Sequence, residues 1–217
     1  MAIEGRVQYA LDNFLKPEYF ESQKETYELL EKDNAGKARI FLNVGTSDNI
    51  CVKNYDDIPD WEILREEKIF HMRKSIDHFI LRKIVGVWEL HMIEIKKTVS
   101  SNTWQDVKLQ MGISYFKIKA LLTFLGISVQ DENILMYTAY SEDKLVANDS
   151  QSEGVTAKTF KTGKRLINPK VDEWDAGFIY IPLIDFEGNI YLKKFKHVKI
   201  KLEPAPDNIP ECIFTLT

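Results

Sequence analysis

Hydrophobic residues recur along this chain with two spacings, and the change between them separates predicted strands from a predicted helix. Residues 75–97 form two strand-like runs that meet at Val85-Gly86, which predicts a β-hairpin with a two-residue turn. Over residues 103–125 the hydrophobic positions instead recur every three or four residues, as on one face of a helix. The cluster Ser100-Ser-Asn-Thr before that run and Gly126 after it are typical helix boundaries.

The remaining pattern predicts further strands on both sides of this centre. A run rich in Glu, Gln, Lys and Leu begins at Pro17 and predicts a helix to about Asp33. A second helix is expected from Asp60 to about Met72. Strands are expected over residues 37–44, 50–54, 133–140 and 178–202, with a turn at 187–188, and after Pro210. The predicted fold is therefore α/β: a central mixed sheet flanked by helices over residues 1–140, and a β-rich C-terminal extension over 141–217 packed on this core.

The hairpin has a register that the side chains favour. A turn at residues 85–86 places Arg82 opposite Glu89, and opposite charges attract at that distance. A slip of one residue would break this pair and every hydrophobic pair beside it. The same register sets Asp77 opposite Glu94, and Lys96 lies on the same face because strand residues two apart share a face. Two carboxylates and one ammonium therefore meet at the open end of the hairpin.

The amino-acid composition and the net charge exclude several classes of protein. The 217 residues are 44% hydrophobic and 29% charged, which is the balance of a globular protein. No uncharged stretch is long enough to span a bilayer, the first residues are too polar for a signal peptide, and two cysteines make no disulfide framework. We therefore expect a cytoplasmic protein without a membrane partner. The net charge of −4 is too small for a DNA mimic, while residues 61–127 carry 11 basic against 7 acidic side chains, a net of +4.

An acid on one strand, Glu-x-Lys on the next and then a helix resembles the PD-(D/E)xK nuclease superfamily over about residues 60–140. This superfamily includes type II restriction enzymes and the RecB-like nucleases. The resemblance implies a restriction-endonuclease-like sheet. It also implies that Asp77, Glu94 and the backbone carbonyl of Ile95 bind Mg²⁺ or Mn²⁺. Lys96 would orient the attacking water and stabilise the charged phosphate.

Other positions match the superfamily less closely. Ile76 stands where many members have proline. RecB-like members carry Gln-x-x-x-Tyr on the helix, but here Gln110 is followed by Tyr115, one residue too late. Some members add an acid from an upstream helix, for which Glu62, Glu66 and Glu67 are all available here. We therefore regard Gln110 and Glu67 as candidate supporting residues. A basic segment without acids supplies further candidates for phosphate contacts, namely Lys158, Lys161, Lys164 and Arg165.

Two carboxylates and a lysine suit phosphodiester hydrolysis even without the family resemblance. Phosphodiester hydrolysis builds negative charge on phosphate oxygens, and a hard cation held by carboxylates neutralises it. We expect a metal-dependent nuclease that cuts DNA in preference to RNA. The resemblance further implies that the protein forms a homodimer. One alternative is a catalytically inactive nuclease-fold protein of a phage or mobile element that binds or inhibits a protein partner. Others are a structural subunit of a larger assembly and an ordinary ion cluster at a sheet edge.

Overall fold

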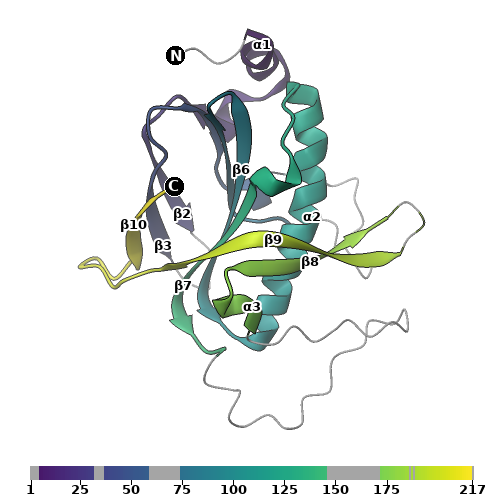
Figure 1. Ribbon diagram of the computed structural model, residues 1–217. Coiled ribbons are helices and arrows are strands. Elements are labelled where there is room, and N and C mark those ends of the chain that lie inside the picture. Colours follow the sequence, from purple (N-terminus) through teal and green to yellow (C-terminus); the bar gives the residue numbers. More distant parts are fainter. Residues whose placement is uncertain are drawn as a thin grey trace.

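The computed structural model describes residues 5–31, 37–58, 74–145, 172–185, 187 and 189–216, and a curved mixed sheet organises them (Figure 1). Seven strands lie in the order β1-β4-β5-β6-β7-β9-β8, and three more form a second sheet in the order β10-β3-β2. The strands are β1 (Phe20–Ser22), β2 (Thr26–Glu31), β3 (Ala38–Asn43), β4 (Asp48–Val52), β5 (His78–Ile84), β6 (Val87–Val99), β7 (Ile134–Asp143), β8 (Phe178–Ile184), β9 (Ile190–Lys201) and β10 (Glu211–Thr215). The α/β class with a mixed sheet is therefore confirmed.

Helices are few in this fold. The described α-helices are α1 (Gly5–Phe14), α2 (Ser101–Leu125) and α3 (Asp172–Asp175), and the short 3-10 turns are η1 (Pro17–Tyr19), η2 (Tyr55–Asp57) and η4 (Asp131–Asn133). The long helix α2 lies along one face of the seven-stranded sheet, and α1 packs near the end of α2 (Figure 1). Within the part of the chain that the structure describes, no helix is long and apolar enough to cross a membrane.

The seven-stranded sheet has a hydrophobic core on each face. On the α2 side, β5, β6 and β7 contribute Phe79, Met92 and Met136, among others. On the other side, Ile80 and Ile93 pack against the inner residues of the three-stranded sheet. Successive side chains of a strand point to opposite faces, so each central strand fills both cores. The sheet thus lies between a helical layer and a second sheet.

The order of strands joins segments that are far apart in the sequence. β5 and β6 are antiparallel, whereas β6 and β7 are parallel and connected through α2. β9 adds in parallel beside β7, and β8 completes the edge as the antiparallel partner of β9. β10 pairs in parallel with β3, so residues 211–215 lie beside residues 39–43. Strands of the C-terminal segment therefore belong to both sheets.

The predicted helix from Pro17 to Asp33 is wrong. The structure has η1 there, followed by β1 and β2. In β2, Tyr27 and Leu29 are buried whereas Thr26 and Glu28 are exposed, which is the two-residue period of a strand with one face in the core. The Glu-rich composition favoured a helix, but pairing with β3 outweighs that propensity. The helix expected over residues 60–72 lies outside the described residues.

Candidate active site at the open end of the β5–β6 hairpin

The predicted hairpin register is confirmed. Arg82 pairs with Glu89 and His78 with Ile93, so every pair obeys the register expected from the turn. Val85 and Gly86 form the turn with φ angles of 47° and 83°, both in the left-handed region that a tight two-residue hairpin requires. At the opposite end, β6 continues beyond the start of β5 and carries the predicted site residues.

Two carboxylates and one ammonium meet there. The Lys96 Nζ forms an ion pair with Glu94 Oε1, and Asp77 lies at the position opposite Glu94, one residue before β5 begins. Glu94 is completely buried and Asp77 is 5% exposed, whereas the Lys96 side chain retains 26% exposure. The site is thus open to solvent on the lysine side and closed beneath the acids.

Backbone groups of β6 complete the arrangement. The Ile95 N–H donates a hydrogen bond of 2.5 Å to Asp77 Oδ2. In a strand, the N–H and C=O of one residue point to the same neighbouring strand, so the Ile95 carbonyl also faces the Asp77 side. The carbonyl named by the family resemblance is therefore directed toward the carboxylates.

Burial and the presence of neighbouring acids disfavour the charged forms of the two carboxyl groups. Burial, followed by the charge of Glu94, raises the pKa of Asp77 well above its usual range. Burial also raises the pKa of Glu94 to about 7, although Lys96 opposes this change. Burial alone would lower the pKa of Lys96, but Glu94 and Asp77 outweigh it and raise that pKa. Neither Glu94 oxygen accepts a hydrogen bond of ordinary geometry from the described residues. Its carboxylate therefore has the Lys96 ammonium as its ion-pair partner and little other compensation for burial.

Helix α2 fixes the segment that leads into Asp77. The buried Ser114 hydroxyl accepts a 2.9 Å hydrogen bond from the Ile76 N–H, and Gln110 Nε2 donates to the Ser75 carbonyl at 3.1 Å. Lys117 Nζ donates to Ser75 Oγ at 2.8 Å. These three helix residues follow a spacing of four and three, so they share one face of α2. Gln110, a candidate from the resemblance, thus supports the backbone before Asp77 and does so together with Ser114, the residue at the motif's tyrosine position.

The η2 turn approaches the site from another side. The Tyr55 N–H donates to the Asp77 carbonyl at 2.7 Å, and the Asn54 N–H donates to Nδ1 of His78 at 3.0 Å. Asp56 follows directly and is exposed. These two hydrogen bonds therefore anchor an acidic turn beside the first carboxylate of the site.

Two acids near the site were missed by the sequence reasoning. The charges of Asp56 and Glu31 both raise the pKa of Glu94, and that of Glu31 also raises the pKa of Asp77. Glu31 ends β2, so the wrong helix prediction concealed it, whereas the neighbouring acids Asp56 and Asp57 are visible in the sequence but belong to no motif that would point to the site. Together with Asp77 and Glu94, these two acids outnumber the single ammonium group of Lys96.

Five of the predicted residues are not among those that the structure describes. Glu67 and the basic residues Lys158, Lys161, Lys164 and Arg165 fall outside the described residues. Within the described ranges, no three side chains of His, Cys, Asp or Glu converge closely enough to hold a metal ion. A metal at this place would therefore depend on Asp77, Glu94 and the Ile95 carbonyl, completed by water, which is a donor set that Mg²⁺ accepts.

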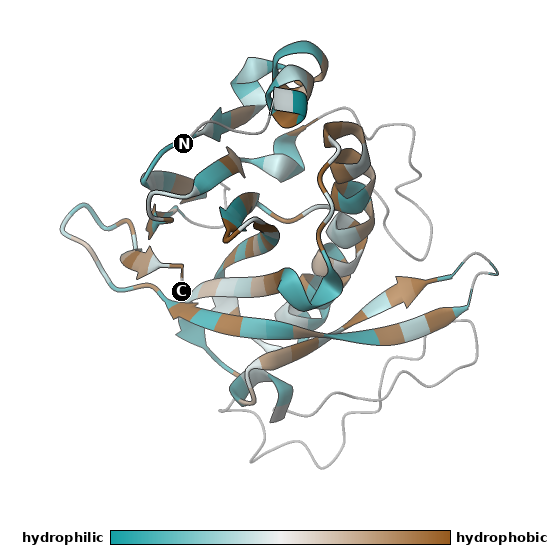
Figure 2. Ribbon diagram, turned by 45° about the horizontal axis from the view of Figure 1, so that its top comes forward, coloured by the Kyte–Doolittle hydropathy of each residue, from teal (hydrophilic) through white to brown (hydrophobic). Residues whose placement is uncertain are grey.

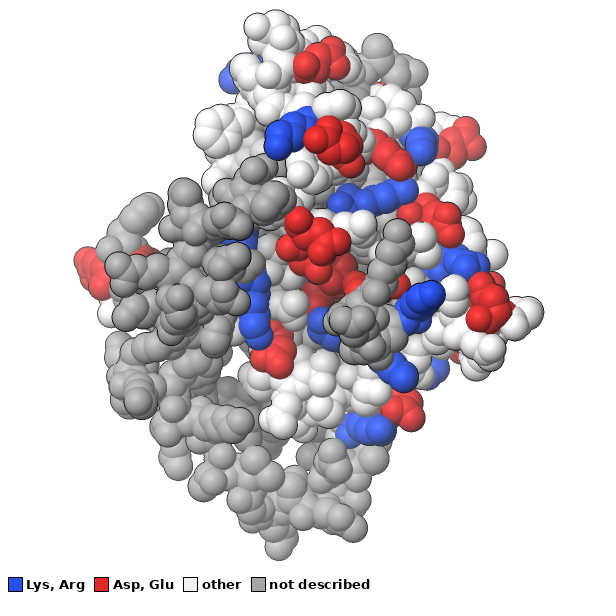
Figure 3. All heavy atoms as spheres, turned by 180° about the vertical axis from the view of Figure 1, so that it is seen from behind, with Lys and Arg blue, Asp and Glu red and all other residues white. Residues whose placement is uncertain are grey.

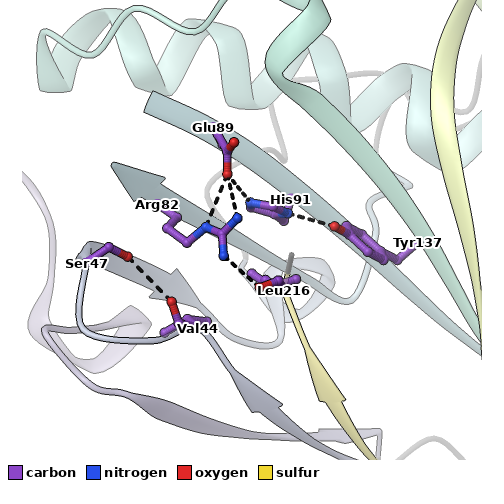
Figure 4. A network of polar contacts seen from close by, with 7 residues as sticks. All are labelled: Val44, Ser47, Arg82, Glu89, His91, Tyr137 and Leu216. Carbon is purple, nitrogen blue, oxygen red and sulfur yellow. Dashed lines mark hydrogen bonds and ion pairs between the residues drawn. The ribbon is translucent and has the colours of Figure 1, made fainter. Parts of the chain in front are cut away.

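A different polar network lies on the opposite face of the hairpin (Figure 4). The Arg82 guanidinium donates to Glu89 at 2.8 Å and to the Leu216 carbonyl at 2.9 Å. His91 lies between Glu89 and the Tyr137 hydroxyl, at 3.2 and 2.9 Å. These groups partner one another and attach the end of the chain to the sheet, so we assign this network a structural role.

Charge is unevenly spread on the surface. Seen from behind, acidic side chains gather near the middle of the face, and lysine and arginine side chains lie around them (Figure 3). This face of the molecule therefore carries both acidic and basic side chains.

Comparisons with protein-family models, with curated proteins and with solved structures found no match to this chain.

Proposed function

We propose that this protein is a divalent-metal-dependent nuclease that hydrolyses phosphodiester bonds, with DNA as the preferred substrate. The observation that carries the proposal is the Glu94 carboxylate, which is fully buried beside Asp77 and has Lys96 as its ion-pair partner. Burying two neighbouring carboxylates is costly unless a cation compensates them. A site for Mg²⁺ or Mn²⁺ explains why the fold tolerates this cost.

The local topology also supports the family resemblance. An antiparallel hairpin carries the acids, α2 follows directly, and β7 returns in parallel beside β6. This succession is the one expected of a restriction-endonuclease-like core, and it therefore supports that part of the proposal. The donors are oxygens of two carboxylates and one carbonyl, which suit a hard divalent cation better than zinc.

Each residue of the candidate active site would have its own role in phosphodiester hydrolysis. Asp77, Glu94 and the Ile95 carbonyl would hold the metal, which when bound supplies positive charge to the phosphate and lowers the pKa of a coordinated water. Lys96 stays protonated, because the neighbouring carboxylates raise its pKa. It therefore acts as a hydrogen-bond donor that orients the attacking water and stabilises charge on the phosphate, not as a general base.

A cleavage assay with matched variants tests the proposal. Circular and linear DNA, single- and double-stranded, and RNA are incubated with the protein and Mg²⁺ or Mn²⁺. Cleavage is expected for the parent and should be lost in Asp77→Ala and Lys96→Ala. Lys97→Ala is the control, because Lys97 is the next residue, is exposed and points to the other face of β6.

The outcomes separate the alternatives. Loss of cleavage in the two site variants but not in Lys97→Ala would support the proposal, and cutting of circular DNA would identify an endonuclease. Absence of cleavage, together with no rise in melting temperature on adding Mn²⁺, would refute it. A protein that binds partners without catalysis, as an inhibitor does, would then be the better explanation.

A further inference from the structure

The β8–β9 hairpin carries the most one-sided charge among the described strands. β9 contains five lysines and no acid, whereas β8 contains no charged residue. The hairpin projects beyond the strands beside it, and hydrophilic and hydrophobic residues succeed one another along it (Figures 1 and 2). A basic ribbon of this kind attracts a polyanion.

One face of this hairpin combines lysines with aromatic rings. Phe178 pairs across the strands with Lys196, and Tyr180 with Lys194, so all four side chains share a face. The two lysines are exposed, and the two aromatic residues are half-buried. The Lys194 ammonium lies 3.9 Å from the centre of the Phe178 ring, and the rings of Phe178 and Tyr180 meet edge to face at 5.4 Å. Aromatic rings and exposed ammonium groups are thus presented together on this face.

Three of these residues, Phe178, Lys194 and Lys196, line a groove that is open to solvent. It has a volume of about 520 Å³ and is bounded by Phe178, Lys194, Phe195 and Lys196 of the hairpin and by Asp131 and Glu132 of η4. Asp131 is already paired with Lys193 and lies 4.0 Å from Lys119. Lys194 and Lys196 of the hairpin supply the positive charge of the groove, and Glu132 of η4 adds a negative charge to its lining.

The groove also has a defined relation to the candidate active site. Ile134 lines the groove and stands at the start of β7, four residues before Thr138, which lies beside Glu94 in the sheet register. In the sheet register Lys196 pairs with Leu135 and Glu94 pairs with Thr138, so the groove lysine and the carboxylate point to opposite faces of the sheet. The groove is therefore a binding place separate from the candidate active site.

We propose that this groove binds a single-stranded segment of nucleic acid, with a base against the Phe178 ring and phosphates on Lys194 and Lys196. An aromatic face is available only to an unstacked base, whereas a duplex hides its base faces. The choice of a nucleic acid as the ligand rests on the proposed nuclease function. The groove adds that the protein would hold this ligand in single-stranded form.

Binding is measured without cleavage, by fluorescence anisotropy of a labelled oligothymidylate of about 16 nucleotides in EDTA. The double variant Lys194→Ala/Lys196→Ala should weaken binding about tenfold or more. Because each phosphate contact on a single strand contributes about 0.7 to the salt slope, its logarithmic salt dependence should fall by about 1.4. The control is Lys24→Ala/Lys144→Ala, which removes two lysines with side-chain exposures of 52% and 54% elsewhere and should bind as the parent does.

Phe178→Leu keeps an apolar side chain in the hairpin but removes the flat ring, and it should weaken binding about tenfold with an unchanged salt slope. The inference is overturned if the parent does not bind the oligonucleotide, if the two lysine pairs behave alike, or if duplex DNA binds equally well to all variants. Failure of the nuclease proposal gives a different pattern, namely retained single-strand binding with no cleavage when Mn²⁺ is added.

Discussion

Replacing Glu94 by Gln should make the metal-free protein more stable at alkaline pH. Glu94 has a pKa of about 7 in the folded protein against an ordinary value of 4.5. Its contribution to stability is therefore fully present below about pH 4.5 and is lost as the pH rises through about 7. The pKa difference corresponds to about 3 kcal/mol, of which roughly 2 to 3 kcal/mol develops between pH 5 and 8.

Thermal unfolding in EDTA at several pH values measures this effect. For a chain of this length, about 1 kcal/mol changes the melting temperature by about 2–4 °C. The advantage of Glu94→Gln over the parent should therefore grow by about 5–10 °C from pH 5 to pH 8. Addition of Mn²⁺ at pH 8 should stabilise the parent and not the variant, because the variant lacks the metal-binding carboxylate.

Glu89→Gln is the control with the opposite sign. His91, followed by Arg82, holds the pKa of Glu89 at about 2, so this group stabilises the folded protein above about pH 4.5 and loses its effect as the pH falls toward 2. Its replacement should lower the melting temperature throughout the neutral range. A stability difference between Glu94→Gln and the parent that does not change with pH would show that Glu94 bears no buried charge, and the metal-site reasoning would fail with it.

Three further substitutions test the framework around the site. Val85→Asn should raise the melting temperature by about 2–8 °C, because a β-branched residue with φ of 47° is strained by about 1–2 kcal/mol and Asn tolerates that conformation. Gly112→Ala should destabilise by about 1–3 kcal/mol in chemical denaturation, since a Cβ would stand 2.6 Å from the Pro182 carbonyl oxygen. Ser114→Ala should cost about 1–3 kcal/mol by leaving the buried Ile76 N–H without its partner, and the weakened support for Asp77 should also reduce Mn²⁺ affinity in calorimetry. Unchanged stability in any one of them would contradict the corresponding contact.

The sequence by itself determined the centre of the molecule. The hairpin register, the meeting of Asp77, Glu94 and Lys96, and the limits of α2 follow from short-range rules. A two-residue turn fixes which residues face each other, and a cap on each side fixes where a helix stops. Ser100 accepts a hydrogen bond from the Thr103 N–H and Gly126 takes a left-handed φ of 69°, as their positions predicted.

Only the tertiary structure decided the rest. The segment holding Glu31 is a strand because β3 offers it a partner, and β3 in turn pairs with β10 from the other end of the chain. Such pairings join residues whose separation leaves no local trace in the sequence. The support of Asp77 by Gln110 and Ser114 likewise depends on how α2 lies across the sheet. Local rules placed Asp77, Glu94 and Lys96 together on the hairpin, and long-range packing decided which acids and which helix lie beside them.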